Sequence, residues 1–276
     1  MTDNPTVTND VAASLRARVD TRRSHTARIW NYWLGGRDHY EVDRAAGDRI
    51  RQLHPGIGEY ARADRLFLGR AVRHLAGEVG IRQFLDIGTG LPTADNTHEV
   101  AQSVAPDSRT VYVDNDPLVL AHARALLTGT PEGRTDFLDE DLRNVDAILR
   151  HAAGTLDFGK PVALMLLGVV IFIGDDEDPY GLVRGLMDRL PSGSHLVLSH
   201  TITSPAMPDV DEAVRFWNEH GTPRLTQRTR EDVTRFFDGL DLLEPGLVSC
   251  SRWRPEEVGG TEPEEVAMFG GVARKA

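Results

Sequence analysis

A short segment, FLDIGTGLPT at residues 84–93, has the residue types needed to bind a nucleotide-like cofactor. An apolar run ends at Asp86, and Gly88 and Gly90 follow with one residue between them. Glycine permits a sharp turn and leaves no Cβ between a ligand and the backbone, and a helix that begins after the turn offers free N–H groups. The segment therefore predicts a strand, a tight turn and a helix that together receive a carboxylate or a phosphate.

The residues around this turn separate two kinds of cofactor. Proteins that bind nicotinamide dinucleotides have a glycine or alanine at the position that Thr93 occupies here. Asp86 stands just before the turn, where its carboxylate would repel a pyrophosphate but can accept hydrogen bonds from the ammonium of a methionine moiety. The turn therefore favours S-adenosylmethionine (SAM) over NAD.

Two further carboxylates follow later strand-like runs. Asp114 ends the run VYVD about 24 residues after Gly90 and can accept both ribose hydroxyls of either cofactor. Asp141, in FLDEDLR, can accept the amino group of adenine. Each carboxylate alone would also serve as a helix N-cap. Their order, one after each successive strand, predicts a nucleoside cofactor site formed by Asp86, Gly88, Gly90, Asp114 and Asp141.

The elements that must position these residues alternate between strand and helix after residue 80. β-rich runs lie near 82–87, 110–114, 134–138, 161–167 and 194–200, and helical stretches lie near 94–104, 117–128, 144–153 and 177–190. Two helices near 209–220 and 229–238 then precede a pair of strands near 241–249 and 264–271, with an exposed hairpin loop at 254–265. This alternation predicts an α/β, Rossmann-like fold with a mostly parallel sheet and helices on both faces.

The chain before this region is different in character. From residue 12 to about residue 80, apolar residues recur at three-to-four spacing and no strand pattern is present. We expect three or four helices there. The chain is accordingly divided into an N-terminal helical extension at 1–80 and a cofactor-binding domain at 81–276.

The segment IWNYWLGGRDHY within the extension is a candidate lid. Trp30, Tyr32 and Trp33 have rings that stack on an acceptor or on adenine, and the two glycines that follow permit closure. Arg37 and Arg65 are candidates for binding an anionic group. The alternative is that the aromatic residues belong to the core and the arginines to the solvated surface.

Charge and cysteine content disfavour several classes of protein. The 276 residues include 31 Lys and Arg against 42 Asp and Glu, a net charge of −11, which disfavours nucleic acid as a partner. The single cysteine, Cys250, cannot form an internal disulfide, and no CxxC pair is present to hold zinc, so we expect no metal site and a cytoplasmic location. The longest apolar run, residues 162–173, is too short to span a bilayer, and we expect no membrane partner.

These motifs together resemble the actinobacterial S-adenosyl methyltransferase family, formerly a domain of unknown function, within the class I SAM-dependent methyltransferases. The matching segments cover nearly the whole chain: TARIWNYWLGGRDHYEVDR, RQFLDIGTGLPT, VYVDNDP, DLR, GSHLVLSH, EPGLV, WRP and GGVARK. The resemblance implies a seven-stranded sheet with an antiparallel last strand, SAM as the cofactor and the same five site residues, but no substrate. The family has a histidine after the fourth strand, where this chain has Ile171, so no role of that histidine carries over.

Methyl transfer is an in-line displacement at an activated carbon, so the protein chiefly aligns the reactants and excludes water. A general base is needed only when the acceptor must lose a proton. His200 is the candidate base, because LVLSH ends the fifth strand and ligand crevices open at strand ends. The alternative is that His200 only hydrogen-bonds a loop.

The sequence therefore predicts a SAM-dependent methyltransferase that acts on an unidentified small-molecule acceptor. A catalytically silent SAM-binding sensor or scaffold is compatible with the same motifs. An NAD-dependent oxidoreductase is less favoured, because of Asp86 and Thr93.

Overall fold

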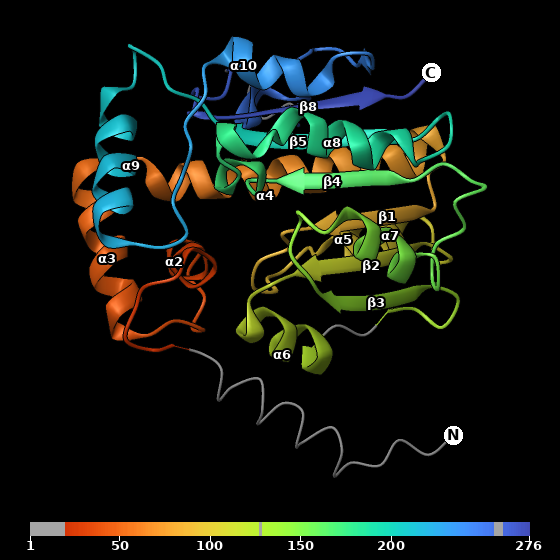
Figure 1. The fold of residues 1–276 in the computed structure, drawn as a ribbon, viewed down its shortest axis with the longest axis horizontal. Coiled ribbons are helices and arrows are strands. Elements are labelled where there is room, and N and C mark those ends of the chain that lie inside the picture. The colour runs from red at the N-terminus through yellow and green to blue at the C-terminus, as the bar shows by residue number, and fades with distance from the viewer. Residues whose placement is uncertain (1–19, 127–128, 257–261) are drawn as a thin grey trace.

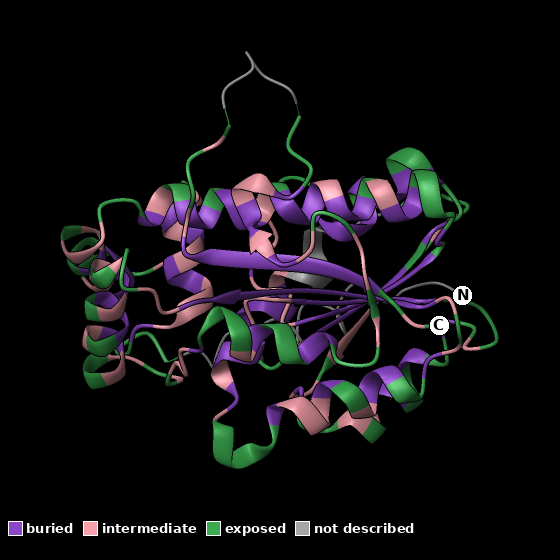
Figure 2. Ribbon diagram, turned by 90° about the horizontal axis from the view of Figure 1, so that it is seen from above, coloured by how far each residue is buried: buried purple, intermediate pink, exposed green. Residues whose placement is uncertain are grey.

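The computed structural model describes residues 20–126, 129–256 and 262–276. Within these ranges one sheet lies between two layers of helices (Figures 1 and 2). The strands are β1 Gln83–Ile87, β2 Arg109–Asp114, β3 Arg134–Asp139, β4 Ala163–Leu167, β5 His195–Thr201, β6 Asp241–Leu242, β7 Val248–Ser249 and β8 Met268–Arg274. The α-helices are α2 Thr26–Trp33, α3 Glu41–Leu53, α4 Ile57–His74, α5 Thr97–Val104, α6 Pro117–Leu126, α7 Val145–Ala152, α8 Pro179–Asp188, α9 Pro208–His220 and α10 Arg230–Thr234.

Short helical turns complete the described elements. They are the π-helical turn η1 Leu75–Val79 and the 3-10 turns η2 Val170–Phe172, η3 Asp175–Glu177, η4 Arg235–Phe237 and η5 Cys250–Arg252. Among the described residues, the extension before β1 contains α2, α3, α4 and η1, and residues 1–19 of the extension lie outside the described residues.

The sheet has the strand order β3-β2-β1-β4-β5-β8-β6, and β7 also pairs with β8. Strands β1 to β5 are parallel, whereas β8 is antiparallel to β5, β6 and β7. Because β5 occupies one side of β8, β6 and β7 share the other side, so the sheet is seven strands wide. The predicted Rossmann-like α/β fold is confirmed. Its strand order reverses between β1 and β4, which is the place where open α/β sheets bind ligands.

The strands are central because both of their faces are apolar. In β1, Phe84 packs with α4 in one core layer, while Leu85 packs with α7 and α8 in the other. The same alternation in β4 sends Met165 to the α4 side and Leu164 to the α7 side. Every residue of β5 is buried: its apolar centre, Leu196–Leu198, lies in the core, and its polar residues are buried as well. The extension therefore shares its core with the sheet through α4.

The helices α2, α3 and α9 stand together beyond one end of the sheet. In Figure 1 the arrowheads of β2, β3 and β4 point toward this group, so the carboxyl ends of the parallel strands face it. The division expected between residues 80 and 81 falls in the turn between η1 and β1, where Gly80 has a φ of +86°. The N-terminal helices are thus placed to cover the strand ends.

The closing strands differ from the sequence prediction. The single strand expected near 241–249 is wrong: β6 and β7 are separated by a turn in which the amide of Gly246 donates to the carbonyl of Leu243. Pro245 has no N–H for the ladder, and Gly246 has a φ of +87°, so these residues leave the sheet and rejoin it at Val248. The strand expected near 264–271 is β8 and begins later, and residues 257–261 of the expected loop lie outside the described residues.

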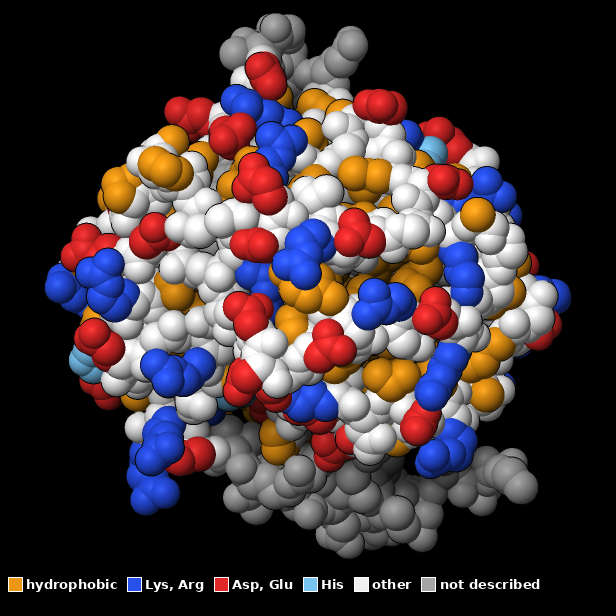
Figure 3. All heavy atoms as spheres, turned by 45° about the horizontal axis from the view of Figure 1, so that its top comes forward, with side chains coloured by type: hydrophobic (Ala, Val, Ile, Leu, Met, Phe, Trp, Pro, Cys, Tyr) orange, Lys and Arg blue, Asp and Glu red, His pale blue; other side chains and the backbone are white. Residues whose placement is uncertain are grey.

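The surface and the helices add two observations. On the face shown in Figure 3, Lys and Arg side chains of the described residues are interspersed with Asp and Glu side chains. Across the described part of the chain, the helices fall short of the length and apolar character that a bilayer-spanning helix requires.

Candidate functional site

A cavity of about 280 Å³ opens at the carboxyl ends of β1, β2 and β4. All five residues predicted to bind the cofactor line it: Asp86, Gly88, Gly90, Asp114 and Asp141. The opposite wall comes from α2 and α4, which contribute Trp30, Asn31, Asp64 and Leu68. The fold therefore brings the strand-end motifs and the N-terminal helices to one place.

The two positions of the turn are glycine for different physical reasons. A Cβ on Gly88 would lie 2.3 Å from Cγ2 of Val169, so the loop after β4 can approach the turn only if this residue is glycine. Gly90 has a φ of +65° and open space where a Cβ would be. Its amide donates to Oδ2 of Asp114 at 2.9 Å, which ties the turn after β1 to the end of β2.

The helix after this turn lies within the stretch near 94–104 that the sequence predicts. α5 begins at Thr97, so a loop separates it from Gly90. Its first turn is occupied: the amide of Asn96 donates to the carboxylate of Glu99 and the amide of His98 donates to the Tyr112 hydroxyl, both at 2.8 Å. The expectation of free N–H donors from this helix is therefore wrong, and the cavity is lined by the turn itself.

Two buried carboxylates face each other across the sheet and helix walls. Asp86 of β1 and Asp64 of α4 are each 5% exposed and both line the cavity. Burial raises the pKa of each to about 6. Hydrogen bonds from the Thr97 hydroxyl to Asp86 and from the Ser199 side chain to Asp64 partly oppose this shift, as does the positive charge of Arg65. A cation bound between them would stabilise their ionised forms.

Asp114 ends β2 with both carboxylate oxygens oriented by the backbone. Oδ2 accepts from the amide of Gly90, and Oδ1 accepts from the amide of Asp116 at 2.9 Å. Burial raises its pKa to about 6 in spite of these two hydrogen bonds. Each oxygen keeps a lone pair, so the carboxylate can still accept two hydroxyl groups, as the ribose prediction requires.

Asp141 is held from two sides after β3. Its Oδ2 accepts from the Asn115 amide group at 3.0 Å, and its Oδ1 accepts from the backbone amide of Arg143 at 2.9 Å. The Arg143 guanidinium also contacts Asp141 and pairs with Glu177 at 2.6 Å, which holds the pKa of Glu177 down at about 2. Asp141 is thus positioned at the cavity wall with its charge partly balanced.

The cavity as a whole has an excess of acidic groups. Its lining carries five carboxylates against two guanidinium groups: Asp64, Asp86, Asp114, Glu140 and Asp141, with Arg65 and Arg143. Arg143 is already paired. Such a wall opposes the two negative charges of a pyrophosphate and favours the sulfonium and ammonium charges of SAM. The residues present therefore fit SAM.

Comparisons with known proteins agree with this chemistry. The S-adenosyl methyltransferase family matches residues 12–276. The chain belongs to this family. It is a methyltransferase that uses SAM as its cofactor. No curated protein matches the chain.

Solved structures extend the comparison. A DUF574 family protein from Streptomyces avermitilis is 45% identical over 94% of this chain and 100% of its own, with a TM-score of 0.89. A candidate methyltransferase from Thermobifida fusca is 39% identical over 93% of this chain and 96% of its own, with a TM-score of 0.85. Magnesium protoporphyrin IX methyltransferase from Synechocystis, solved with bound S-adenosylhomocysteine, is 14% identical over 90% of this chain and 98% of its own, with a TM-score of 0.53. This last likeness shows the fold alone.

The N-terminal aromatic residues of the methyltransferase differ in whether they line a cavity. Trp30 lines the 280 Å³ cavity, whereas Trp33 lines a smaller neighbouring one and donates from Nε1 to the carbonyl of Gly47 at 3.2 Å. Tyr32 lies in neither lining and donates from its hydroxyl to Asp48 at 2.6 Å. Only part of the predicted lid therefore faces a ligand cavity.

The two candidate arginines also differ in whether they line a cavity. Arg37 is exposed and does not line either of these cavities. Arg65 lines the larger cavity and donates to the carbonyls of Ala94 and Asp95 at 3.2 and 3.1 Å. The structure thus places Arg65, but not Arg37, beside the predicted cofactor residues.

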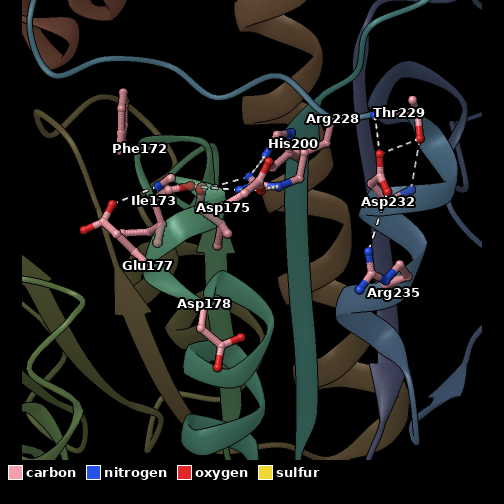
Figure 4. Close-up of polar contacts among 12 residues, drawn as sticks. Phe172, Ile173, Asp175, Glu177, Asp178, His200, Arg228, Thr229, Asp232 and Arg235 are labelled. Carbon is pink, nitrogen blue, oxygen red and sulfur yellow. Dashed lines mark hydrogen bonds and ion pairs between the residues drawn. The ribbon is translucent and has the colours of Figure 1, made fainter.

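His200, the candidate base, lies in the core and does not line the cavity. Its Nδ1 is 2.7 Å from the carbonyl of Thr201, and its Nε2 is 2.9 Å from the guanidinium of Arg228 (Figure 4). Because Arg228 can only donate, the proton of the neutral ring must be on Nδ1. Burial lowers the pKa of His200 to about 4. With both nitrogens engaged, His200 has no lone pair for an acceptor proton, which supports the alternative structural interpretation.

Arg228 organises the loop after β4. Its side chain is 3% exposed and donates to Asp175 at 2.7 Å and to the carbonyl of Ile173 at 2.8 Å. In Figure 4, Phe172 points away from these polar contacts. Phe172 and Ile173 line the cavity, so Arg228 positions one of its walls from behind. Ile171, where the family has a histidine, is 4% exposed and lines the smaller cavity.

Asp64 and His25 were not singled out from the sequence, and both line the cavity. Asp64 lies on the buried face of α4 with Tyr60, Phe67 and Leu68, so an acidic residue at an apolar helical position was the available signal. His25 lines the cavity with its Nδ1 at 2.9 Å from Oδ2 of Asp116, a pairing of positions far apart in the sequence. No local sequence pattern predicts the contact between His25 and Asp116.

Proposed function

We propose that this methyltransferase acts on a small molecule and binds SAM in the 280 Å³ cavity. Asp64 and Asp86 would hold the ammonium group, Asp114 the ribose hydroxyls and Asp141 the adenine amino group. The observation that carries the proposal is the convergence of these carboxylates on one cavity with an acidic excess. When bound, SAM supplies a methyl group already activated for displacement.

The protein's own contribution is alignment and exclusion of water. The N-terminal helices provide apolar groups over the strand ends, with Leu34, Leu68 and Trp30 in the lining, and Phe172 adds another from the β4 loop. These side chains keep water from the reacting centre. No described side chain is assigned as a base, so the proposal is restricted to acceptors whose reacting atom has no proton to lose or loses it to solvent before the acceptor binds.

Charge and shape support a small acceptor over a nucleic acid. The net charge is −11, and Figure 3 shows basic and acidic side chains mixed on the face in view. The cavity is walled by α2 and α4 as well as by the strand ends, which restricts access for a folded macromolecule. Cys250 is a buried free thiol, and we infer a reducing compartment, the cytoplasm.

The decisive experiment has a binding arm and a turnover arm. Calorimetry with SAM, S-adenosylhomocysteine and NAD should give binding of the two adenosyl ligands and none of NAD. Incubation with labelled-methyl SAM and a cell extract, followed by size fractionation, should place the label in the small-molecule fraction. Label confined to protein or nucleic acid would contradict the proposed acceptor class, and NAD binding alone would contradict the cofactor assignment.

A further inference from the structure

A second cavity of about 70 Å³ adjoins the first. Four residues line both: Thr26, Trp30, Gly168 and Phe172. The smaller cavity, here called the aromatic chamber, lies between α2, α3, α9 and the ends of β4 and β5. The aromatic chamber and the larger cavity are therefore neighbours that share part of their walls.

The wall of the aromatic chamber is uncharged. Its described lining holds aromatic rings from several elements and aliphatic side chains from α2, α3 and α9, with no Asp, Glu, Lys, Arg or His. The rings are Trp30, Trp33, Tyr60, Phe172 and Trp217. The indole N–H groups of Trp33 and Trp217 donate to the carbonyls of Gly47 and Pro223, so they are not offered to a ligand. This wall contrasts with the acidic wall next to it.

One polar pair interrupts the apolar lining. The hydroxyl of Tyr60 is hydrogen-bonded to the hydroxyl of Thr201, and both residues are nearly buried. A hydroxyl pair uses only one of its two protons for the mutual bond. Contacts within the described part of the chain give the second proton no acceptor. A ligand oxygen at this point would accept a hydrogen bond from the second proton. A buried donor that is left without an acceptor costs free energy, so this hydrogen bond would favour binding.

We propose that the aromatic chamber binds an uncharged, mostly apolar part of the methyl acceptor that carries one oxygen, such as a phenolic or enolic ring edge. The inference rests on the proposed function, because it assumes that the neighbouring cavity holds SAM. An ionised group would lose its hydration in this chamber without gaining a partner charge. An apolar group gains burial against five rings.

The volume restricts the size of that part. An engineered cavity that holds benzene measures roughly 150 Å³, about twice the aromatic chamber. A single ring enters only if one edge remains in the region shared with the cofactor cavity, beside Trp30 and Phe172. The acceptor group is therefore no larger than a monocyclic ring.

The test uses phenol and toluene, which are alike in size but differ in polarity, and benzoate, which is larger and charged. Each is titrated at pH 7 into the full-length protein saturated with S-adenosylhomocysteine, with ligand-detected NMR as the readout. We expect phenol to bind, toluene at least threefold more weakly and benzoate at least tenfold more weakly. Tyr60→Phe should bring phenol to the level of toluene.

Matched variants on α9 locate the binding. Ala213 lines the aromatic chamber, and its neighbour Glu212 is exposed. Ala213→Phe should weaken phenol at least tenfold, while Glu212→Phe should change it less than twofold. Ala213→Val, which adds less volume, should weaken phenol about threefold and replaces the first variant if thermal unfolding shows that Ala213→Phe does not fold.

The outcomes separate this inference from the proposed function. Absence of phenol binding, equal binding of benzoate, or unchanged binding in the chamber-filling variant would overturn the aromatic chamber as an acceptor site. S-adenosylhomocysteine titration of the same samples reports on the cofactor cavity independently. If the wild-type protein does not bind S-adenosylhomocysteine, the proposed function is overturned.

Discussion

The two adjoining cavities of this methyltransferase are built on opposite principles. The cofactor cavity is lined by carboxylates and glycines that follow successive strands, and its acidic groups have raised pKa values because they are buried. The aromatic chamber is lined by uncharged side chains from helices distant in the sequence. An acidic wall and an uncharged wall thus lie side by side in one protein, and Trp30 and Phe172 belong to both.

The side chains that line the two cavities are also held in place by different kinds of contact. Asp114 is oriented by two backbone amides, so its geometry depends on the turn after β1 and on the start of the next loop. Phe172 is oriented from behind, by a loop that the buried Arg228 holds through Asp175 and backbone carbonyls. Backbone amides thus orient Asp114, whereas the buried side chain of Arg228 holds the loop that carries Phe172.

Asp114→Asn is expected to have the largest effect, because it changes the cofactor cavity and leaves the aromatic chamber intact. The Asn amide group would place an N–H donor against a backbone donor, Gly90 or Asp116, and would remove a ribose acceptor. We expect S-adenosylhomocysteine affinity to fall about 100-fold, or roughly 2.7 kcal/mol, by calorimetry. Asp107→Asn, at an exposed ion pair with Arg82, is the control and should change affinity less than twofold. A threefold or smaller loss for Asp114→Asn would mean that the ligand binds elsewhere.

His200 tests whether a buried group outside both linings affects only stability. His200→Asn leaves the Arg228 guanidinium short of an acceptor, and we expect a loss of about 2 kcal/mol in the free energy of unfolding at pH 7.5. S-adenosylhomocysteine affinity should stay within twofold. Loss of turnover with unchanged stability would restore His200 as the catalytic base.

The pH dependence of the same pair has a definite sign. The folded pKa of His200 is lowered to about 4, so its stabilisation is complete above the unfolded pKa near 6.5 and is lost as pH falls toward 4. Wild type should therefore lose more stability than His200→Asn on acidification over this window, measured by urea unfolding. Parallel curves for the two proteins would show that His200 is not neutral in the folded state.

The acidic wall predicts pH-dependent cofactor binding. Asp64, Asp86 and Asp114 have pKa values raised to about 6 by burial, so they are ionised above this value and protonated below it. A cationic ligand needs the ionised forms, and we expect SAM affinity to fall about tenfold from pH 7 to pH 5, or roughly 1.4 kcal/mol. The uncharged analogue methylthioadenosine should show a flatter profile in the same calorimetric series. Identical profiles for the two ligands would argue against a carboxylate–cation interaction.

The smallest effect is expected from Tyr32, which faces neither cavity. Its hydroxyl donates to Asp48 at the surface, and Tyr32→Phe should change stability by less than about 0.5 kcal/mol and ligand affinity less than twofold. Trp30→Phe, in the wall that both cavities share, is the contrasting variant and should weaken phenol at least threefold in the NMR titration. Equal effects of the two variants would show that the N-terminal aromatic residues act as one lid.

Much of the cofactor side could be predicted from local patterns. Strand, turn and carboxylate recur in order, and the carboxyl ends of parallel strands meet at one edge, so Asp86, Asp114 and Asp141 had to lie close together once the strands were recognised. The start of α5 has a local signal in the capping box of Asn96 and Glu99, but the contact of the His98 amide with the distant Tyr112 hydroxyl could not be predicted. Local sequence does not report such a contact.

The sequence by itself determined the parallel sheet, the glycine turn and the acidic strand ends, because these depend on residue order and on a periodicity that short segments carry. Only the tertiary structure decided that Asp64 of α4 lines the same cavity as Asp86 of β1, that Trp30 lines it while Tyr32 does not, and that His200 contacts Thr201 and Arg228. Each of these depends on a contact between segments far apart in the chain, where packing selects the partner.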